Sequence, residues 1–189
     1  SDLLVGGKTK VLMQDLVLIR WKQDLKLDRD KLTKLMASIK LIDVSRDAKL
    51  EKLKEMIAQK IAQPINDNNR KVIVFTAFAD TANYLYDNLA VGLFQKHGIH
   101  TGKVTGSTEP KTTLRLAANP RQGIDFQTML TLFAPRAKEK ALTMPHEPGE
   151  IDLMIGTDCI SEGQNLQDCD TVINYDIHWN PVRIIQRFG

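Results

Sequence analysis

The sequence predicts an α/β protein whose parallel sheet is flanked by helices, and three observations support this fold class. Short apolar runs rich in β-branched residues, such as KVIVFT, are typical of strands buried on both faces. Segments with helical periodicity separate these runs along the chain. Because strand and helix alternate, we expect right-handed crossovers between parallel strands.

Helical periodicity dominates the first sixty residues, where we predict three helices. Leu12, Leu16 and Ile19 share one helical face, and a second group repeats the spacing: Leu32, Leu35, Met36 and Ile39. The third helix follows either Ser45 or Asp47 as its cap, with an inward face made of Leu50, Leu53, Ile57 and Ile61. We interpret its lysines as a solvated face rather than a nucleic-acid patch: Lys49, Lys52 and Lys54.

Four strand candidates follow, at KVIVFT, TGKVTG, IDLMIG and TVINYD. The helix DTANYLYDNLAVGLFQKH separates the first two, and four of its side chains are predicted to point inward: Leu85, Leu89, Leu93 and Phe94. The stretch 109–150 then precedes the third strand. It contains one helix, DFQTMLTLF, capped by Asp125, between flanks rich in Pro, Arg and Lys that are typical of loops.

These elements predict the domain organisation. We expect an N-terminal helical segment over 1–44 and a main α/β domain over 45–189, with a helical insertion at 109–150 between the second and third strands. The flanks of that insertion are basic, and we favour a solvated role for them over contact with nucleic acid.

Composition excludes several classes of protein. At 42% hydrophobic and 26% charged residues, the chain is typical of a soluble globular protein. It has no apolar run of the roughly 18 residues that a membrane span needs, and its start lacks the features of a secretory signal, so we expect a cytoplasmic protein without a membrane partner. Two cysteines and four scattered histidines give no disulfide framework and no metal site.

Small polar residues follow three of the predicted strands. Thr76 follows the first strand, Gly106 and Ser107 follow the second, and GTDCISEGQNLQ begins at the end of the third. Ligands of parallel sheets collect at this edge, where backbone N–H groups are exposed. Each residue alone could be a cap or a turn residue, but three such groups at corresponding strand ends favour a phosphate-bearing ligand.

The chain does not contain the fingerprints of a self-sufficient nucleotide enzyme. It has no GxxxxGK[ST] loop and no GxGxxG after a strand, so it has no triphosphate cradle of its own. Asp158 and Glu162 are four residues apart, which suits an acid/base pair as well as a capping Asp with a solvated Glu. The absence of any cofactor fingerprint disfavours a small-molecule α/β enzyme.

A resemblance to a known family rests on four blocks in order: DAKLEKLKEMI, KVIVFTAFADTANYLYDNL, KVTGST and IDLMIGTDCISEGQNLQDCDTVINYDIHWNPVRIIQRFG. They resemble the second RecA-like lobe of superfamily 2 helicases, and most of all the Swi/Snf-like ATP-driven DNA translocases and their bacterial relatives. The resemblance covers roughly residues 45–108 and 151–189, and it implies a RecA-like sheet.

The resemblance also implies the site residues. Thr76 matches the end of motif IV, Gly106 and Ser107 match the loop after the next strand, and Thr157 and Asp158 match the start of motif V. In the family these positions contact the nucleic-acid backbone. The implied partner is DNA, with duplex DNA favoured over RNA.

Other positions match the nucleotide-facing part of the family. Gly163 and Asn165 match the later part of motif V, while Gln186 and Arg187 match the start of motif VI, which completes the ATP site and supplies catalytic side chains. The implied cofactors are ATP and Mg²⁺, held mainly by the N-terminal RecA-like lobe of the same polypeptide. None is expected on this chain alone.

The last ten residues, NPVRIIQRFG, match only the opening of motif VI. In the family the arginines that reach the ATP phosphates follow its glycine, and such an arginine is worth about 10³ to 10⁵ in rate. We therefore expect a piece of a longer motor that is inactive on its own. The same stretch is also an ordinary helix start, with Asn180 as cap and Pro181 in the first position. An inactive nucleic-acid-binding or interaction module of the same fold is the alternative.

Overall fold

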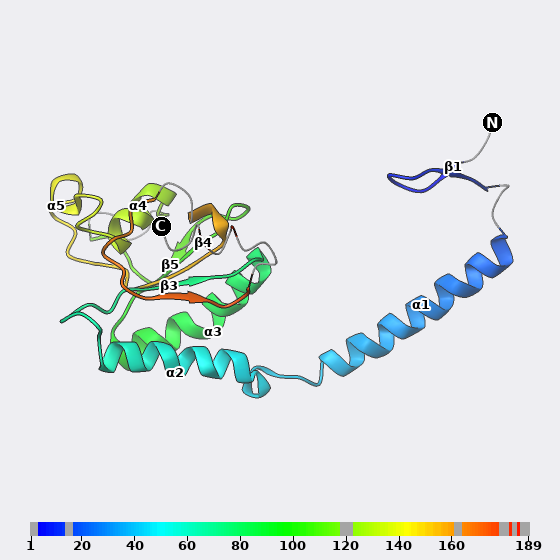
Figure 1. Cartoon of the computed structure of the whole chain (residues 1–189), viewed down its shortest axis with the longest axis horizontal. Coiled ribbons are helices and arrows are strands. Elements are labelled where there is room, and N and C mark those ends of the chain that lie inside the picture. The colour runs from blue at the N-terminus through cyan, green and yellow to red at the C-terminus, as the bar shows by residue number, and fades with distance from the viewer. Residues whose placement is uncertain are drawn as a thin grey trace. The chain divides into compact units, whose positions relative to one another are not determined.

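The structure is a computed structural model that describes residues 4–13, 17–117, 123–160 and 164–177, together with residues 182 and 185. The chain divides into two compact units, Ser1–Ala48 and Lys49–Gly189, which are described separately below (Figure 1). No helix in the described ranges is long and apolar enough to cross a membrane.

The first unit contains a hairpin and a long helix. Strands β1 (Leu4–Val5) and β2 (Val11–Leu12) pair antiparallel, and helix α1 (Leu18–Ile39) follows. A short 3-10 helix, η2 (Val44–Arg46), is capped by Asp43, whose Oδ1 accepts a hydrogen bond from the Ser45 N–H at 2.9 Å. Helix α1 has no buried side chain.

The hairpin corrects the prediction of a helix through Leu12, Leu16 and Ile19. Leu12 lies in β2 and Ile19 lies in α1, while Leu16 falls outside the described residues. The turn depends on Gly6, because its φ is +125° and an added Cβ would lie 2.1 Å from the Thr9 carbonyl oxygen. The second predicted group, Leu32 to Ile39, lies in α1, so the described part of the first sixty residues holds two long helices rather than three.

The second unit is built on a five-stranded sheet in the order β5-β4-β6-β3-β7. The strands are β3 (Val72–Phe75), β4 (Thr101–Val104), β5 (Lys111–Thr112), β6 (Leu153–Gly156) and β7 (Val172–Asn174). Strands β4, β6, β3 and β7 are parallel, whereas β5 is antiparallel to β4. The four predicted strands and the parallel α/β fold are therefore confirmed. Strand β5 was not predicted.

Helices cover both faces of this sheet (Figure 1). On one face, α2 (Ala48–Ala62) and α3 (Ala79–His97) pack with Val72, Val74 and Leu153 in one apolar cluster. On the other face, α4 (Phe126–Phe133) packs with Ile73, Phe75 and Met154 in a second cluster. A short helix, α5 (Lys140–Thr143), follows α4.

The predicted helix details are largely confirmed. Asp125 caps α4, with its Oδ1 accepting from the Thr128 N–H at 2.8 Å. Helix α2 buries Leu50, Leu53 and Ile57 as expected. The inward position of Phe94 was wrong, because this ring near the end of α3 is exposed and stacks on His100 with the ring centroids 4.8 Å apart.

Polar contacts join the ends of α2 and β3 to the segment before β7. Lys60 Nζ at the end of α2 lies 2.5 Å from the Asp170 carboxylate, and Asn66 donates to the same carboxylate at 2.8 Å. Lys71 Nζ, at the start of β3, donates to Glu150 and to the Ile151 carbonyl, each at 2.8 Å. Charged groups thus join the amino ends of these strands. The exposed loop after β4 lies at the opposite, carboxyl edge of the sheet.

Candidate functional site

The carboxyl ends of the four parallel strands form one edge in register. Three backbone hydrogen bonds extend the ladder past the strands: Thr76 N–H donates to the Gly156 carbonyl at 3.0 Å, Thr157 N–H to Val104 at 3.3 Å and Tyr175 N–H to Phe75 at 2.8 Å. The residues that follow each strand therefore lie along a single edge. The structure brings together there the predicted nucleic-acid contacts: Thr76, Gly106, Ser107, Thr157 and Asp158.

The loop after β4 presents two of these residues to solvent. Thr105 is buried, and its hydroxyl lies 2.6 Å from the Thr108 hydroxyl and accepts from the Thr108 N–H at 3.2 Å. This turn leaves Gly106 and Ser107 exposed. An added Cβ at Gly106 would meet only the Cys159 Cβ at 3.8 Å, so packing does not require glycine here.

The turn after β6 is more tightly built. Residues Asp158–Ile160 form the 3-10 helix η3, which returns the buried Ile160 side chain over the strand end. A Cβ at Gly156 would lie 2.2 Å from Ile160 Cδ1, so this close approach needs glycine. Thr157 and Asp158 are half-buried, and the Thr157 hydroxyl contacts Cys159 Sγ at 3.4 Å. Thr157 is thus held firmly at the edge.

Thr76, after β3, is placed differently from the other predicted contacts. Its side chain is fully buried, and its hydroxyl donates to Asp176 Oδ2 at 2.7 Å. The Thr76 hydroxyl oxygen also accepts a hydrogen bond from the Phe78 N–H at 3.3 Å. The hydroxyl therefore points into the protein toward Asp176 rather than out toward a ligand, and its role in binding nucleic acid stays a prediction.

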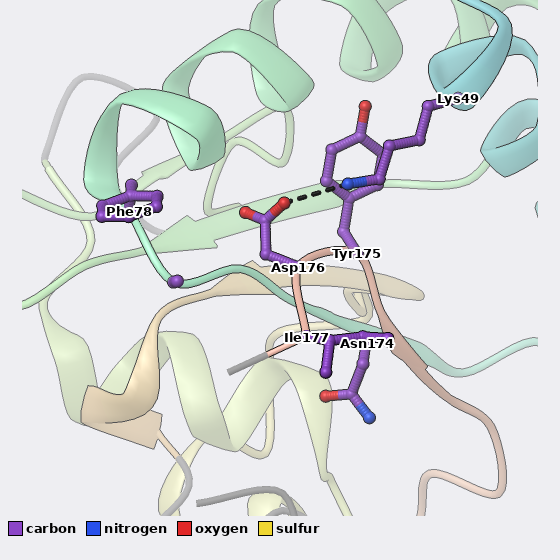
Figure 2. Close-up of a pocket in the computed structure, with 7 residues that line it drawn as sticks. Lys49, Phe78, Asn174, Tyr175, Asp176 and Ile177 are labelled. Atoms are coloured by element: carbon purple, nitrogen blue, oxygen red, sulfur yellow. Dashed lines mark hydrogen bonds and ion pairs between the residues drawn. The ribbon is translucent and has the colours of Figure 1, made fainter. Parts of the chain in front are cut away.

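Asp176, which the sequence did not single out, binds two side chains at this edge. Besides Thr76 it binds Lys49, whose Nζ lies 3.0 Å from Asp176 Oδ1 and 4.0 Å from the centre of the Tyr175 ring (Figure 2). Burial acts to raise the pKa of Asp176, but the hydrogen bonds from Thr76, Lys49 and the Ala77 N–H, with the Lys49 charge, outweigh it and lower the pKa.

A cavity of about 660 Å³ opens beside this ion pair. Figure 2 shows Lys49 reaching in from α2, Phe78 at the start of α3, and Tyr175 and Asp176 from the segment after β7. The lining residues are Lys49, Ala77, Phe78, Asn174, Tyr175, Asp176 and Ile177. Phe78 and Ile177 are exposed, so the cavity mixes apolar surface with one neutralised charge pair.

Of the four residues expected to face a nucleotide, only Asn165 lies in a described range. It is exposed, and its Oδ1 accepts from the Gln167 N–H at 3.3 Å. Gly163, Gln186 and Arg187 lie outside the described residues, as does Glu162, the possible acid/base partner of Asp158.

The chemistry of this donor set suits ATP phosphates better than a metal ion. An amide, a guanidinium and backbone N–H groups donate to phosphate oxygens, whereas Mg²⁺ prefers carboxylate oxygens, which these four residues do not contain. Across the described ranges no group of three or more His, Cys, Asp or Glu side chains could hold a metal ion. Both cysteines are free thiols, and burial raises the pKa of Cys169 to about 11.

The sequence is similar to a known domain family and to a known protein. Residues 48–189 match the helicase conserved C-terminal domain. The uncharacterized ATP-dependent helicase YqhH of Bacillus subtilis strain 168 is 51% identical over 41 residues, which are 22% of this chain. The chain spans only 7% of the length of that relative through this match.

Two solved structures match parts of this chain. The Pyrococcus furiosus Hef helicase domain matches 74% of this chain and 22% of its own, with 26% identity and a TM-score of 0.46. The C-terminal part of the Fun30 ATPase domain matches 83% of this chain and 43% of its own, with 18% identity and a TM-score of 0.47.

The family match agrees with the architecture at the level of elements. It begins at the first residue of α2 and spans the whole five-stranded sheet with its carboxyl edge. It also contains the motif blocks from which the sequence predicted a helicase lobe. The chain therefore belongs to the family of helicase conserved C-terminal domains.

Proposed function

We propose that this chain is the C-terminal motor lobe of an ATP-dependent DNA translocase or helicase. Family membership supports the motor lobe. The nucleic-acid site is supported by one observation. The exposed residues Gly106 and Ser107 after β4 lie beside Thr157, which follows the neighbouring strand β6. Hydroxyl and backbone donors in such loops suit the phosphates of a nucleic-acid strand.

The uncharged donors at this edge suit a protein that moves along nucleic acid. Phosphate contacts position a protein on nucleic acid without selecting a base sequence, so Ser107 and Thr157 would hold any sequence with similar affinity. The contact of Asp158 with nucleic acid stays a prediction from the family resemblance. We infer duplex DNA as the substrate, because the family resemblance is greatest to DNA translocases.

The nucleotide half of the proposal involves a second lobe. Gly163, Asn165, Gln186 and Arg187 would face ATP and Mg²⁺ held mainly by an N-terminal RecA-like lobe, and ATP hydrolysis would supply the free energy for movement. Gln186 and Arg187, which match the start of motif VI, would help to complete that ATP site. Binding between the lobes would favour a closed arrangement, and a difference in DNA affinity between closed and open arrangements would convert turnover into a step.

Replacing Thr157 by Val in the full-length protein tests the edge. The change keeps the shape of the side chain but removes its hydroxyl. Because a hydrogen bond to a charged group contributes about 1.5–3 kcal/mol, we expect the DNA concentration for half-maximal ATPase stimulation to rise about 10- to 100-fold. Thr131→Val is the matched control, since the Thr131 hydroxyl donates within α4, to the Gln127 carbonyl at 2.9 Å.

The outcomes separate the two functions that the sequence left open. A response of Thr157→Val equal to that of Thr131→Val would contradict the role given to Thr157. A wild-type protein that binds DNA but shows no ATP turnover with or without it would instead identify the inactive binding module.

A further inference from the structure

Three residues that are distant in the sequence meet behind the carboxyl edge. Lys49 belongs to the first turn of α2, Thr76 follows β3 and Asp176 follows β7. The distances are 3.0 Å from Lys49 Nζ to Asp176 Oδ1 and 2.7 Å from the Thr76 hydroxyl to Asp176 Oδ2. Each carboxylate oxygen thus has its own partner, and we name this set the Lys49–Asp176–Thr76 network.

The network runs from the core to the surface. Thr76 is fully buried, the Asp176 side chain is 23% exposed and the Lys49 side chain is 55% exposed. The Tyr175 ring lies 4.0 Å from the Lys49 ammonium, which adds a cation–π contact to the ion pair. The charge at the solvent end can therefore influence a hydroxyl that solvent does not reach.

Asp176 also holds the backbone that leads into α3. Its carboxylate accepts from the Ala77 N–H, while the Thr76 hydroxyl accepts from the Phe78 N–H at 3.3 Å. Phe78 is the N-cap residue of α3 and provides no side-chain hydrogen bond of its own. The network therefore binds the N–H groups of the two residues that precede α3.

The position of Asp176 joins two parts of the proposed motor. On one side is the loop of Thr76 at the edge proposed to face DNA. On the other side, Asp176 comes ten residues before Gln186 in the sequence, at the start of the segment proposed to face ATP. The Asp176 carboxylate, just after β7, holds the described start of this segment to the loop after β3, because separating them would leave a partly buried charge without its donors.

We propose that Lys49 and Asp176 are positioning residues that couple the DNA-facing loop after β3 to the ATP-facing segment after β7. This inference rests on the proposed function. With the network intact, DNA bound at the edge alters ATP hydrolysis. Without it, the lobe keeps its fold and its basal ATPase, but DNA no longer stimulates turnover fully.

The first experiment needs only the 189-residue chain. Lys49→Met keeps an apolar stem beside Tyr175 but removes the charge, and Lys52→Met on the same helix is the matched control, because Lys52 forms an exposed ion pair with Glu55 at 2.9 Å. We expect Lys49→Met to speed amide hydrogen exchange at Ala77 and Phe78 at least fivefold. Equal exchange in the two variants would overturn the proposal.

The second experiment uses the full-length protein. Lys49→Met and Asp176→Asn are each expected to lower the DNA-stimulated kcat about tenfold, while the basal kcat and the KM for ATP stay unchanged. If the residues act as one network, the double variant loses no more than either single variant. Additive losses, or an equal fall in basal turnover, would show separate structural effects and overturn the coupling.

The two experiments distinguish this inference from the proposed function. Normal DNA stimulation in Lys49→Met overturns the coupling and leaves the motor assignment standing. A wild-type protein without DNA stimulation overturns the motor assignment and the coupling together. The exchange rates at Ala77 and Phe78 then still decide whether Lys49 positions the loop.

Discussion

Helices α1 and α2 carry similar apolar patterns but differ completely in burial. In α1, Leu32 and Leu35 are 65% and 58% exposed, and the helix has no buried side chain. In α2, Leu50 and Ile57 are fully buried and Leu53 is 2% exposed. Periodicity thus predicts a helix and its apolar face. Whether that face is buried depends on elements elsewhere in the chain, which for α2 include β3 and α3.

The sharpest way to break this comparison is to truncate the buried face of α2. Leu53→Ala removes side-chain carbon atoms from a packed cluster and leaves a cavity, so we expect the free energy of unfolding to fall by about 3–4 kcal/mol. Native-state hydrogen exchange at the Val74 amide measures this loss within the second unit. A loss below about 1 kcal/mol would mean that α2 contributes little to that core.

The polar anchor at the end of α2 should matter next. Asp170→Asn keeps the size of the side chain but removes the charge facing Lys60 Nζ at 2.5 Å. We expect a loss of about 2 kcal/mol in the free energy of unfolding, the scale of a hydrogen bond to a charged group. Lys52→Gln, on the exposed face of the same helix, is the control and should change it by less than about 0.5 kcal/mol.

The same anchor predicts a pH dependence. Burial acts to raise the pKa of Asp170, but hydrogen bonds from Lys60, Asn66 and Thr171, with the Lys60 charge, outweigh it and lower the pKa. The folded carboxyl therefore binds its proton at lower pH than the unfolded one, whose pKa is about 3.9. Its stabilisation is present above that value and is lost as pH falls through the folded pKa.

Urea unfolding between pH 6 and pH 2.5, followed by circular dichroism, would detect this loss. The midpoint should fall less steeply with acid in Asp170→Asn than in the wild type, because the variant no longer has the titrating group. Parallel pH profiles for the two proteins would refute the assignment.

The smallest effect is expected in α1. Leu35→Ala shortens an exposed side chain, so the free energy of unfolding of the second unit should change by less than about 0.5 kcal/mol. Exchange at the Val74 amide again provides the measurement. A loss approaching that of Leu53→Ala would remove the contrast between the two helices.

The sequence predicted the main elements of the sheet because they satisfy a local rule. VIVF and LMIG are continuous apolar runs, and the structure buries all four residues of both strands. Strand β5 has no such pattern, since Lys111 and Thr112 are held by backbone pairing with β4. The first hairpin was missed because Leu12 matches a helical spacing by chance, although Gly6 and Gly7 offered a turn signal.

The site was predictable only in outline. Parallel strands gather their carboxyl ends at one edge, so placing Ser107 and Thr157 together needed only strand order and direction. The role of Asp176 depends on Thr76 and Lys49, which are distant in the sequence, and no local pattern marks that meeting. Lys52 and Lys54 form ion pairs on the solvated face of α2, as predicted. Lys49 instead forms an ion pair with Asp176 beside the carboxyl edge of the sheet.

The order of strands has a consequence for synthesis. Strand β3 lies between β6 and β7 in the sheet, yet both partners come much later in the chain, from Leu153 and Val172 onward. At about 5–20 residues per second, the interval between the emergence of β3 and of β6 is roughly 4–16 s. During that time the apolar run Val72–Phe75 has two unpaired edges, and its faces can be shielded only by α2 and α3 and, late in the interval, by α4. The nascent chain therefore passes through an aggregation-prone interval that the finished sheet conceals.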